Sequence, residues 1–217
     1  MQNVIDLILR QRVVAIMRRI YGDDLYNLVG ALADGGMKLV EVTFDQGDAD
    51  CLAKTPHAIA ELDRRFGGRM MVGAGTVLNP AQVDAAAGAG AKFIISPNVS
   101  ADVIRRTKEL GLVSMPGAMT PTELLTAHDL GADFVKVFPY VDLGIGYLKS
   151  ILAPINHIRF VATGGVTDAD LPKLFDIGFA GAGISIWLSE QKLIEEGNFA
   201  EFTRRAKIIS DIVAAYS

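Results

Sequence analysis

The sequence is poor in the residues that build disulfides and metal sites. Its single cysteine, Cys51, cannot form an internal disulfide, which favours a reducing compartment. Its three histidines, His57, His128 and His157, have no ligand spacing between them, so we expect no metal site. No apolar run approaches the roughly 18 residues of a membrane span, and the first residues lack the pattern of a secretory signal. We therefore expect a cytoplasmic protein with no membrane partner.

The sequence also lacks an excess of positive charge. It has 21 lysines and arginines against 25 acidic residues, a net charge of −4, which argues against a nucleic acid partner. Half of the residues are hydrophobic, enough for a substantial core. No low-complexity stretch or linker divides the chain. We therefore expect one domain over residues 1–217 that binds a small molecule.

One junction recurs along the chain: a glycine that can end a helix is followed at once by strand-forming residues. Glycine supplies the left-handed conformation of a helix C-terminus, and an immediate strand implies a short loop. The junction occurs within residues 33–40, 88–95, 110–113, 130–135 and 177–180. Short apolar runs predict eight strands, near 13–17, 38–43, 70–74, 92–96, 112–116, 133–138, 158–162 and 179–184.

Helix-compatible stretches separate these strands, among them 120–130 and 167–177, and a last helix is expected near 198–215. At one helix start Thr120 can cap, Pro121 suits the first helical position and Glu123 can close a capping box. Eight alternating units in a chain of this length predict an α/β fold, a (β/α)₈ TIM barrel. An open doubly wound sheet is the alternative, because a sequence does not show closure.

A lysine interrupts one otherwise apolar strand. Strand alternation places Phe134, Lys136 and Phe138 on one face and Val135 and Val137 on the other. Apolar residues on both faces are typical of a fully buried strand. Burial disfavours the ammonium form, so Lys136 can become a neutral amine that attacks a carbonyl. The alternative is a long side chain that reaches the surface from the strand end.

Glu41 is equally isolated, between Val40 and Val42. A buried glutamate beside a buried lysine suggests a general base next to a Schiff-base nucleophile; the alternative is a carboxylate held by loop amides. In a barrel, the inward residues lower in the strands are expected to be Ile16, Leu39, Ala74, Ile94, Phe134 and Val161. The polar residues expected around the C-terminal mouth, where such enzymes bind substrate, are Arg18, Glu41, Thr43, Thr76, Ser96, Lys136 and Thr163.

Three glycine clusters follow predicted strands, at 73–76, 163–166 and 181–185. Glycine lets backbone N–H groups approach an anion closely, and the loops after the seventh and eighth strands of such barrels commonly bind phosphate. Tight turns between strand and helix also require glycine, so these clusters alone do not establish a phosphate site.

Six ordered stretches carry a resemblance to a known family: Val40–Phe44, Val72–Leu78, Ile95–Asn98, Met115–Glu123, Val135–Pro139 and Phe160–Val166. Through them the chain resembles, over nearly its whole length, the 2-keto-3-deoxy-6-phosphogluconate (KDPG) / 4-hydroxy-2-oxoglutarate (KHG) aldolases, which are class I pyruvate aldolases. The resemblance implies that Lys136 forms the Schiff base and that Glu41 is the acid/base. The substrate-binding candidates are Thr76, Pro97, Thr163, Gly164, Gly165 and Ser185. The resemblance further implies a homotrimer, and we expect no cofactor.

Two positions depart from the family pattern. Many members carry an arginine four residues after the base glutamate, where it holds the substrate carboxylate, but this chain has Asp45. Arg18, at the end of the first strand, is the best substitute. After the last strand the family usually has a Gly-Ser pair for phosphate, where this chain has Ser185 and Ile186. A bulky Ile186 should obstruct a phosphate pocket unless Ser185 takes over.

These residues predict reversible cleavage of a 2-keto-4-hydroxy acid, KDPG or KHG, to pyruvate and an aldehyde. The related 2-keto-3-deoxy-6-phosphogalactonate (KDPGal) and unphosphorylated 2-keto-3-deoxy sugar acids are alternative substrates. Two other classes stay open at this point: a phosphate-binding barrel isomerase or epimerase, which needs no imine, and a non-catalytic barrel that has lost its substrate contacts.

Overall fold

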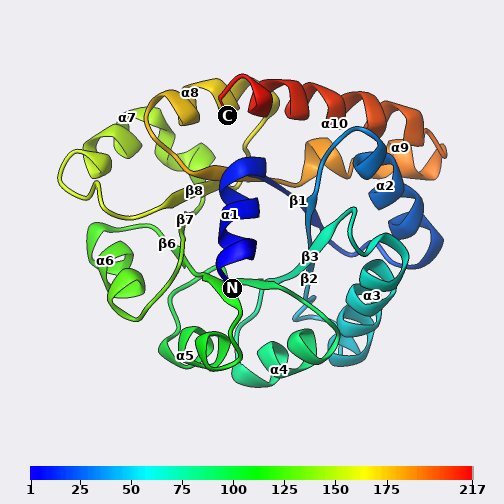
Figure 1. Ribbon diagram of the computed structural model, residues 1–217, viewed down its shortest axis with the longest axis horizontal. Helices are drawn as coiled ribbons and strands as arrows, with labels where there is room; N and C mark the ends of the chain where they lie inside the picture. Colours follow the sequence, from blue (N-terminus) through cyan, green and yellow to red (C-terminus); the bar gives the residue numbers. More distant parts are fainter. Residues whose placement is uncertain (217) are drawn as a thin grey trace.

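The computed structural model describes residues 1–216 and shows strands wound into a barrel with helices around them (Figure 1). Neighbouring strands are all parallel, in the order β5-β4-β3-β2-β1-β9-β8-β7-β6. The strands are β1 (Val13–Met17), β2 (Leu39–Thr43), β3 (Met71–Gly75), β4 (Phe93–Ile95), β5 (Val113–Met115), β6 (Gly117–Ala118), β7 (Val135–Val137), β8 (Phe160–Thr163) and β9 (Gly181–Ile184).

The two edges of this sheet, β5 and β6, are one strand interrupted at Pro116. Proline has no N–H group and cannot donate to the ladder. β5 pairs with β4, whereas β6 pairs with β7 and sets Gly117 opposite Lys136. The Pro116 carbonyl accepts a hydrogen bond from the Lys136 amide at 2.9 Å. The barrel therefore closes through this strand, and the eight predicted strands are confirmed.

The helices form a ring outside the barrel, with α10 lying along the outer side of the N-terminal part of the chain (Figure 1). The layer between sheet and helices is the larger apolar core. None of the helices within residues 1–216 is long and apolar enough to cross a membrane. The helices are α1 (Gln2–Gln11), α2 (Gly22–Asp34), α3 (Cys51–Phe66), α4 (Pro80–Gly88), α5 (Ala101–Glu109), α6 (Pro121–Asp129), α7 (Tyr140–Leu152), α8 (Leu171–Asp176), α9 (Gln191–Glu195) and α10 (Phe199–Ala214), with short 3₁₀ turns η1 (Asp168–Asp170) and η2 (Ile186–Leu188).

Helix α1 closes the N-terminal end of the barrel. Figure 1 shows it lying across the middle of the ring of strands. Its Ile5 and Ile8 are buried and pack into a second apolar core. The barrel residues of that core are Val14, Leu39, Phe93, Ile95, Val113, Met115, Phe134 and Val161. Because these side chains fill the lower barrel, only the C-terminal end can hold a ligand.

The predicted helices are confirmed with small changes in their bounds. The stretch near 198–215 is α10, and 167–177 contains η1 followed by α8. Helix α6 begins after the predicted capping box. Thr120 Oγ1 accepts from the Glu123 amide at 3.4 Å, and Glu123 Oε2 accepts from the Thr120 amide at 2.8 Å.

The predicted inward face of β3 and β4 is wrong by one residue. Ala74 and Ile94 belong to the outer core, whereas Phe93 and Ile95 point into the barrel. A Cβ atom added at Gly73 would overlap the Phe93 ring. Gly73 is thus a glycine because the aromatic ring of the neighbouring strand occupies the space.

Candidate active site

One cavity of about 670 Å³ lies at the C-terminal end of the barrel. The residues that line it come from β1, β2, β7, β8 and β9 and from the loops that follow the strands. All nine residues predicted for the site line it: Arg18, Glu41, Thr76, Pro97, Lys136, Thr163, Gly164, Gly165 and Ser185. The fold therefore brings together residues that are far apart in sequence, as the prediction of a barrel mouth required. Their individual roles stay predictions.

Lys136 lies in the middle of β7 and is 7% exposed. Desolvation lowers the pKa of its ammonium group; the nearby Glu41 carboxylate opposes this shift and the positive charge of Arg18 adds to it. Its Nζ lies 4.7 Å from the centroid of the Phe138 ring, a contact that favours the cation over a π face. The prediction of a buried lysine is confirmed, and the side chain does not extend to the outer surface from the strand end.

Glu41 lies in the middle of β2 and is 2% exposed. Desolvation raises the pKa of its carboxyl to about 7, although Lys136 and Arg18 both act to lower it. Within residues 1–216 its Oε2 accepts no hydrogen bond, so the alternative of a carboxylate held by loop amides does not apply to this atom. A carboxyl group whose pKa lies near neutral pH and whose Oε2 has no hydrogen-bond partner in the described chain can exchange a proton with a ligand.

Oε1 of the same carboxylate lies against β3. A Cβ atom at Gly75 would overlap Glu41 Oε1, so a side chain at that position would displace the carboxylate. Thr76 follows with a φ of 55°, in the left-handed region. This reversal of strand geometry explains how Thr76 lines the cavity although alternation from the inward Gly75 would turn it away.

Arg18 follows the last residue of β1 and lies at the boundary between two cavities. It lines the large one and also a smaller one of about 260 Å³ that contains Asp45. Its positive charge lowers the pKa of both Glu41 and Lys136. Arg18 is therefore close enough to act electrostatically on both buried groups.

The loop after β8 contributes two glycines in the left-handed region, Gly164 with φ 95° and Gly165 with φ 77°. A Cβ atom at Gly164 would lie 3.1 Å from the Phe138 ring, and one at Gly165 would lie 2.6 Å from Val141 Cβ. Both the conformation and the space thus require glycine here. The tight loop places backbone directly at the cavity wall beside Thr163.

Two polar residues predicted at the mouth do not line the large cavity. Ser96 donates its Oγ hydrogen bond to the Val77 carbonyl at 2.7 Å, and Thr43 donates to the Met17 carbonyl at 3.3 Å. Ser96 comes directly after the inward Ile95, so alternation along β4 turns its side chain away from the barrel interior. Thr43 lines only the smaller cavity. Their hydroxyl groups hold the loops in place.

A family model described as "KDPG and KHG aldolase" matches residues 4–205. The chain belongs to this family. It is an aldolase, a carbon–carbon lyase. Over 172 residues, 79% of this chain and 81% of the relative, it is 37% identical to the 2-dehydro-3-deoxy-6-phosphogalactonate aldolase of Escherichia coli. Over 214 residues, 98% of this chain and 99% of the relative, it is 31% identical to the 2-dehydro-3-deoxy-phosphogluconate aldolase of Treponema pallidum.

The fold of this aldolase also matches solved structures of the family. The KDPG aldolase of Legionella pneumophila, crystallised with pyruvate as a covalent carbinolamine intermediate, superposes with a TM-score of 0.82. The two chains are 25% identical, and the match covers 94% of this chain and 97% of that one. The predicted family and barrel are therefore confirmed.

Several residues of the aldolase cavity were not predicted as site residues. The clearest is Phe138, whose place on the same strand face as Lys136 follows from alternation and could have identified it. Trp187 and Glu190 lie beyond the last strand, where no periodicity locates a side chain. The unpredicted lining residues are Ile16, Phe138, Val166, Thr167, Gly183, Trp187 and Glu190.

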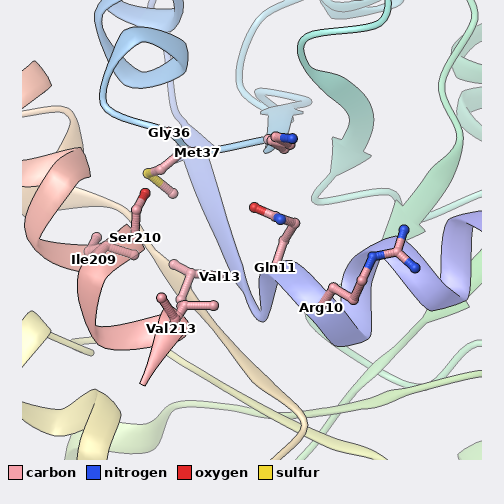
Figure 2. A pocket seen from close by; sticks show the side chains of 10 residues that line it. Arg10, Gln11, Val13, Gly36, Met37, Ile209, Ser210 and Val213 are labelled. Atoms are coloured by element: carbon pink, nitrogen blue, oxygen red, sulfur yellow. The ribbon is translucent and has the colours of Figure 1, made fainter. Parts of the chain in front are cut away.

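A third cavity, of about 180 Å³, lies at the closed end of the aldolase, between α1 and α10. It contains the cations Arg10 and Lys38 and the hydroxyl group of Ser210. Figure 2 shows the Arg10 guanidinium on the far side of Gln11 from Ser210. Ser210 Oγ already donates to backbone carbonyls of Gly35 and Ala206. These groups do not converge on one point, so this cavity is a poor ligand site.

No group of three His, Cys, Asp or Glu side chains that could hold a metal ion occurs in the described part of the aldolase. His128 and His157 contact each other edge to face at 5.0 Å between ring centroids. Cys51, at the start of α3, is half-buried and packs against the outer core.

Proposed function

We propose that this aldolase works through a Schiff base on Lys136, and that it reversibly cleaves a 2-keto-4-hydroxy acid to pyruvate and an aldehyde. The observation that carries the proposal is the joint burial of Lys136 and Glu41 in one cavity, with the pKa of the amine lowered and that of the carboxyl raised. Opposite shifts of this kind bring the pKa values of both groups closer to neutral pH, so that each group can donate and accept protons there.

In the proposed mechanism the neutral Lys136 amine adds to the C2 carbonyl of the substrate. Loss of water gives a protonated imine, which accepts the electron pair when the C3–C4 bond breaks. Glu41 removes the proton of the 4-hydroxyl group, so that C4 leaves as the aldehyde, and then protonates C3 of the enamine to form the methyl group. Water finally hydrolyses the imine and releases pyruvate from Lys136.

Arg18 is proposed to hold the substrate carboxylate. It is a guanidinium at the cavity wall whose charge acts on both buried groups, and a bidentate pair with a carboxylate suits its geometry. Thr76, Pro97 and Thr163 are proposed to surround the pyruvate part. Three further residues are proposed to surround the aldehyde part: Gly164, Gly165 and Ser185.

The proposed substrates are KDPG and KHG, with KDPGal and unphosphorylated 2-keto-3-deoxy sugar acids as alternatives. Support comes from the names of relatives, which include aldolases for both phosphorylated sugar acids. We further propose, from the family resemblance, that the chain is a single domain that assembles as a homotrimer in the cytoplasm and needs no metal, so that activity survives a chelator.

Borohydride reduction in the presence of pyruvate tests the proposal. We expect a reduced pyruvyl adduct on Lys136, located by intact mass and peptide mapping, and none in Lys136→Arg. An adduct on another lysine, or none at all, would overturn the Schiff-base assignment. Turnover of a sugar phosphate without borohydride inactivation would instead indicate an isomerase or epimerase, and absence of any pyruvate-dependent thermal shift would indicate a non-catalytic barrel.

A further inference from the structure

Two apolar side chains stand out at the mouth of the large cavity. Ile186 is 80% exposed and Val141 is 63% exposed, the highest values among the exposed large apolar residues of the described chain. Ile186 lines the cavity directly. Val141 lies over Gly165, which also lines it. An exposed apolar side chain gains stability when an apolar group covers it, so Ile186 in the cavity lining can contribute to binding.

Ile186 is held in this exposed position by the turn that contains it. The Leu188 amide donates to the Ser185 carbonyl at 2.8 Å, and Ser189 Oγ donates to the same carbonyl at 3.0 Å. Leu188 is fully buried and anchors the turn in the outer core. These contacts hold the backbone of Ile186 at the cavity mouth, where its side chain is available to a ligand.

The charges beside Ile186 offer a phosphate group little. Glu190 lines the cavity with Ile186, and its cation partner, Arg205, is already paired; the two cations of the described chain that line the cavity, Arg18 and Lys136, are assigned to the pyruvate half. Arg205 Nη1 lies 2.9 Å from Glu190 Oε2 and also donates to the Trp187 carbonyl at 2.9 Å, while its Nε lies 2.9 Å from Glu201 Oε1. A dianion entering this end would meet one carboxylate and a guanidinium that two carboxylates already neutralise.

We propose that Ile186, Val141 and Trp187 form an apolar subsite that takes the uncharged carbon tail of the aldehyde half of the substrate. This inference rests on the proposed function and narrows its acceptor class to unphosphorylated aldehydes, with those that carry an alkyl or aryl tail favoured; among the proposed substrates it therefore favours the unphosphorylated acids over KDPG and KDPGal. In the synthetic direction the enamine carbon derived from the pyruvate methyl group bonds to the aldehyde carbon. The aldehyde oxygen takes up a proton as its π bond breaks, and water then releases the 2-keto-4-hydroxy acid from Lys136.

The test compares acceptor aldehydes in the synthetic direction with pyruvate in excess. The acceptors are butanal, glyceraldehyde and glyceraldehyde 3-phosphate, and kcat/KM is measured for each. We expect Ile186→Ser to lower kcat/KM for butanal about tenfold, as removal of one or two buried methylene contacts does, and to change it less than twofold for glyceraldehyde. Ile186→Leu should keep the wild-type preference. Leu125→Ser, which removes an exposed leucine on α6, is the matched control and should change neither value.

Borohydride trapping of pyruvate separates the two proposals. If Lys136 is labelled equally in wild type and Ile186→Ser but all three acceptors lose the same factor, Ile186 is structural and the subsite is overturned, while the aldolase mechanism stands. A wild-type preference of 100-fold or more for glyceraldehyde 3-phosphate over butanal would also overturn it. So would a smaller assembly of Ile186→Ser in light scattering, because a second copy of the chain would then cover Ile186. Absence of label in wild type would instead refute the proposed function itself.

Discussion

Arg19 and Asp45 form a two-point ion pair at the rim of the barrel. Arg19 Nε lies 2.8 Å from Asp45 Oδ2, and Nη2 lies 3.2 Å from Oδ1, which also accepts a hydrogen bond from the Gly47 amide at 3.2 Å. These bonds hold the pKa of Asp45 below its usual value. The pair fixes Arg19 at a φ of 57°, a conformation that residues other than glycine rarely adopt. The turn it holds comes directly after Arg18.

Asp45→Asn is expected to weaken substrate binding indirectly. Asp45 does not contact the substrate in the proposed complex, but its ion pair with Arg19 holds the turn that follows Arg18. Loss of the pair frees the turn at Arg19, so KM should rise roughly threefold to tenfold while kcat changes little. Double reversal, Arg19→Asp with Asp45→Arg, should restore part of the loss. Steady-state kinetics on KDPG or KHG measure the split. An equal fall in kcat, or no effect on KM, would contradict a positioning role for Asp45.

Arg18→Ala should raise KM sharply. If Arg18 holds the carboxylate, its loss removes a charge-assisted contact, for which an increase of roughly 10- to 100-fold is expected. Arg10→Ala, which removes an exposed arginine at the opposite end of the barrel, is the matched control and should behave as wild type. An unchanged KM in Arg18→Ala would assign the carboxylate to another group.

Glu41→Gln should slow exchange of the pyruvate methyl protons with D₂O by about 10²–10⁴-fold, the usual contribution of a general base. In wild type the exchange rate should rise with pH through about 7, because only the deprotonated carboxylate accepts a proton and the pKa of Glu41 is raised to about 7. The variant should lose this step, while borohydride still traps pyruvate on Lys136. Proton NMR follows the exchange, and a wild-type rate in Glu41→Gln would place the base elsewhere.

The same raised pKa makes the stability of the free enzyme depend on pH. The folded state holds the Glu41 proton up to about pH 7, whereas the unfolded chain releases it near 4.5. The contribution of Glu41 to stability is therefore fully present below pH 4.5 and is lost as the pH rises to about 7, by about 3 kcal/mol. Glu41→Gln should flatten this part of the profile in urea unfolding, and an unchanged slope would refute the raised pKa.

Gly75→Ala should displace the base without removing it. The new methyl group would overlap Glu41 Oε1, the mobile end of a side chain, so we expect a loss of activity of at least tenfold with a thermal midpoint close to that of wild type. Gly88→Ala is the control, since a Cβ atom there meets nothing within 4 Å. A fully active Gly75→Ala would show that the position of Glu41 is not critical.

Sequence periodicity located the strands and the two buried charged groups because each strand is a short apolar run and Lys136 and Glu41 interrupt two of them. It failed on β3 and β4. On β3 the inward Gly73 and Gly75 have no side chain, so alternation was counted from Ala74; on β4 the inward Phe93 and Ile95 flank an equally apolar Ile94, so alternation does not distinguish the two faces.

Two further features depend on information that no local pattern carries. Thr76 reaches the cavity through a left-handed residue conformation, which strand alternation does not describe. The pairing of Arg19 with Asp45 joins loops 26 positions apart, so the resemblance to the family indicated only that Asp45 stands where many members have an arginine. Trp187 and Glu190 reach the cavity from the segment after β9. In that segment the tertiary packing, and not a strand or helix periodicity, determines where each side chain points.

The helix that seals the lower barrel with Ile5 and Ile8 has a kinetic consequence. When an active-site cavity has a single entrance, the reactant that binds deeper must enter first and leave last. Lys136 lies deep and is 7% exposed, whereas Ile186 stands at the rim and is 80% exposed. If pyruvate is attached to Lys136 and the aldehyde lies toward Ile186, as proposed, we expect synthesis to be ordered with pyruvate first, and in cleavage the aldehyde should leave before pyruvate. Product inhibition patterns therefore test this order of binding and release.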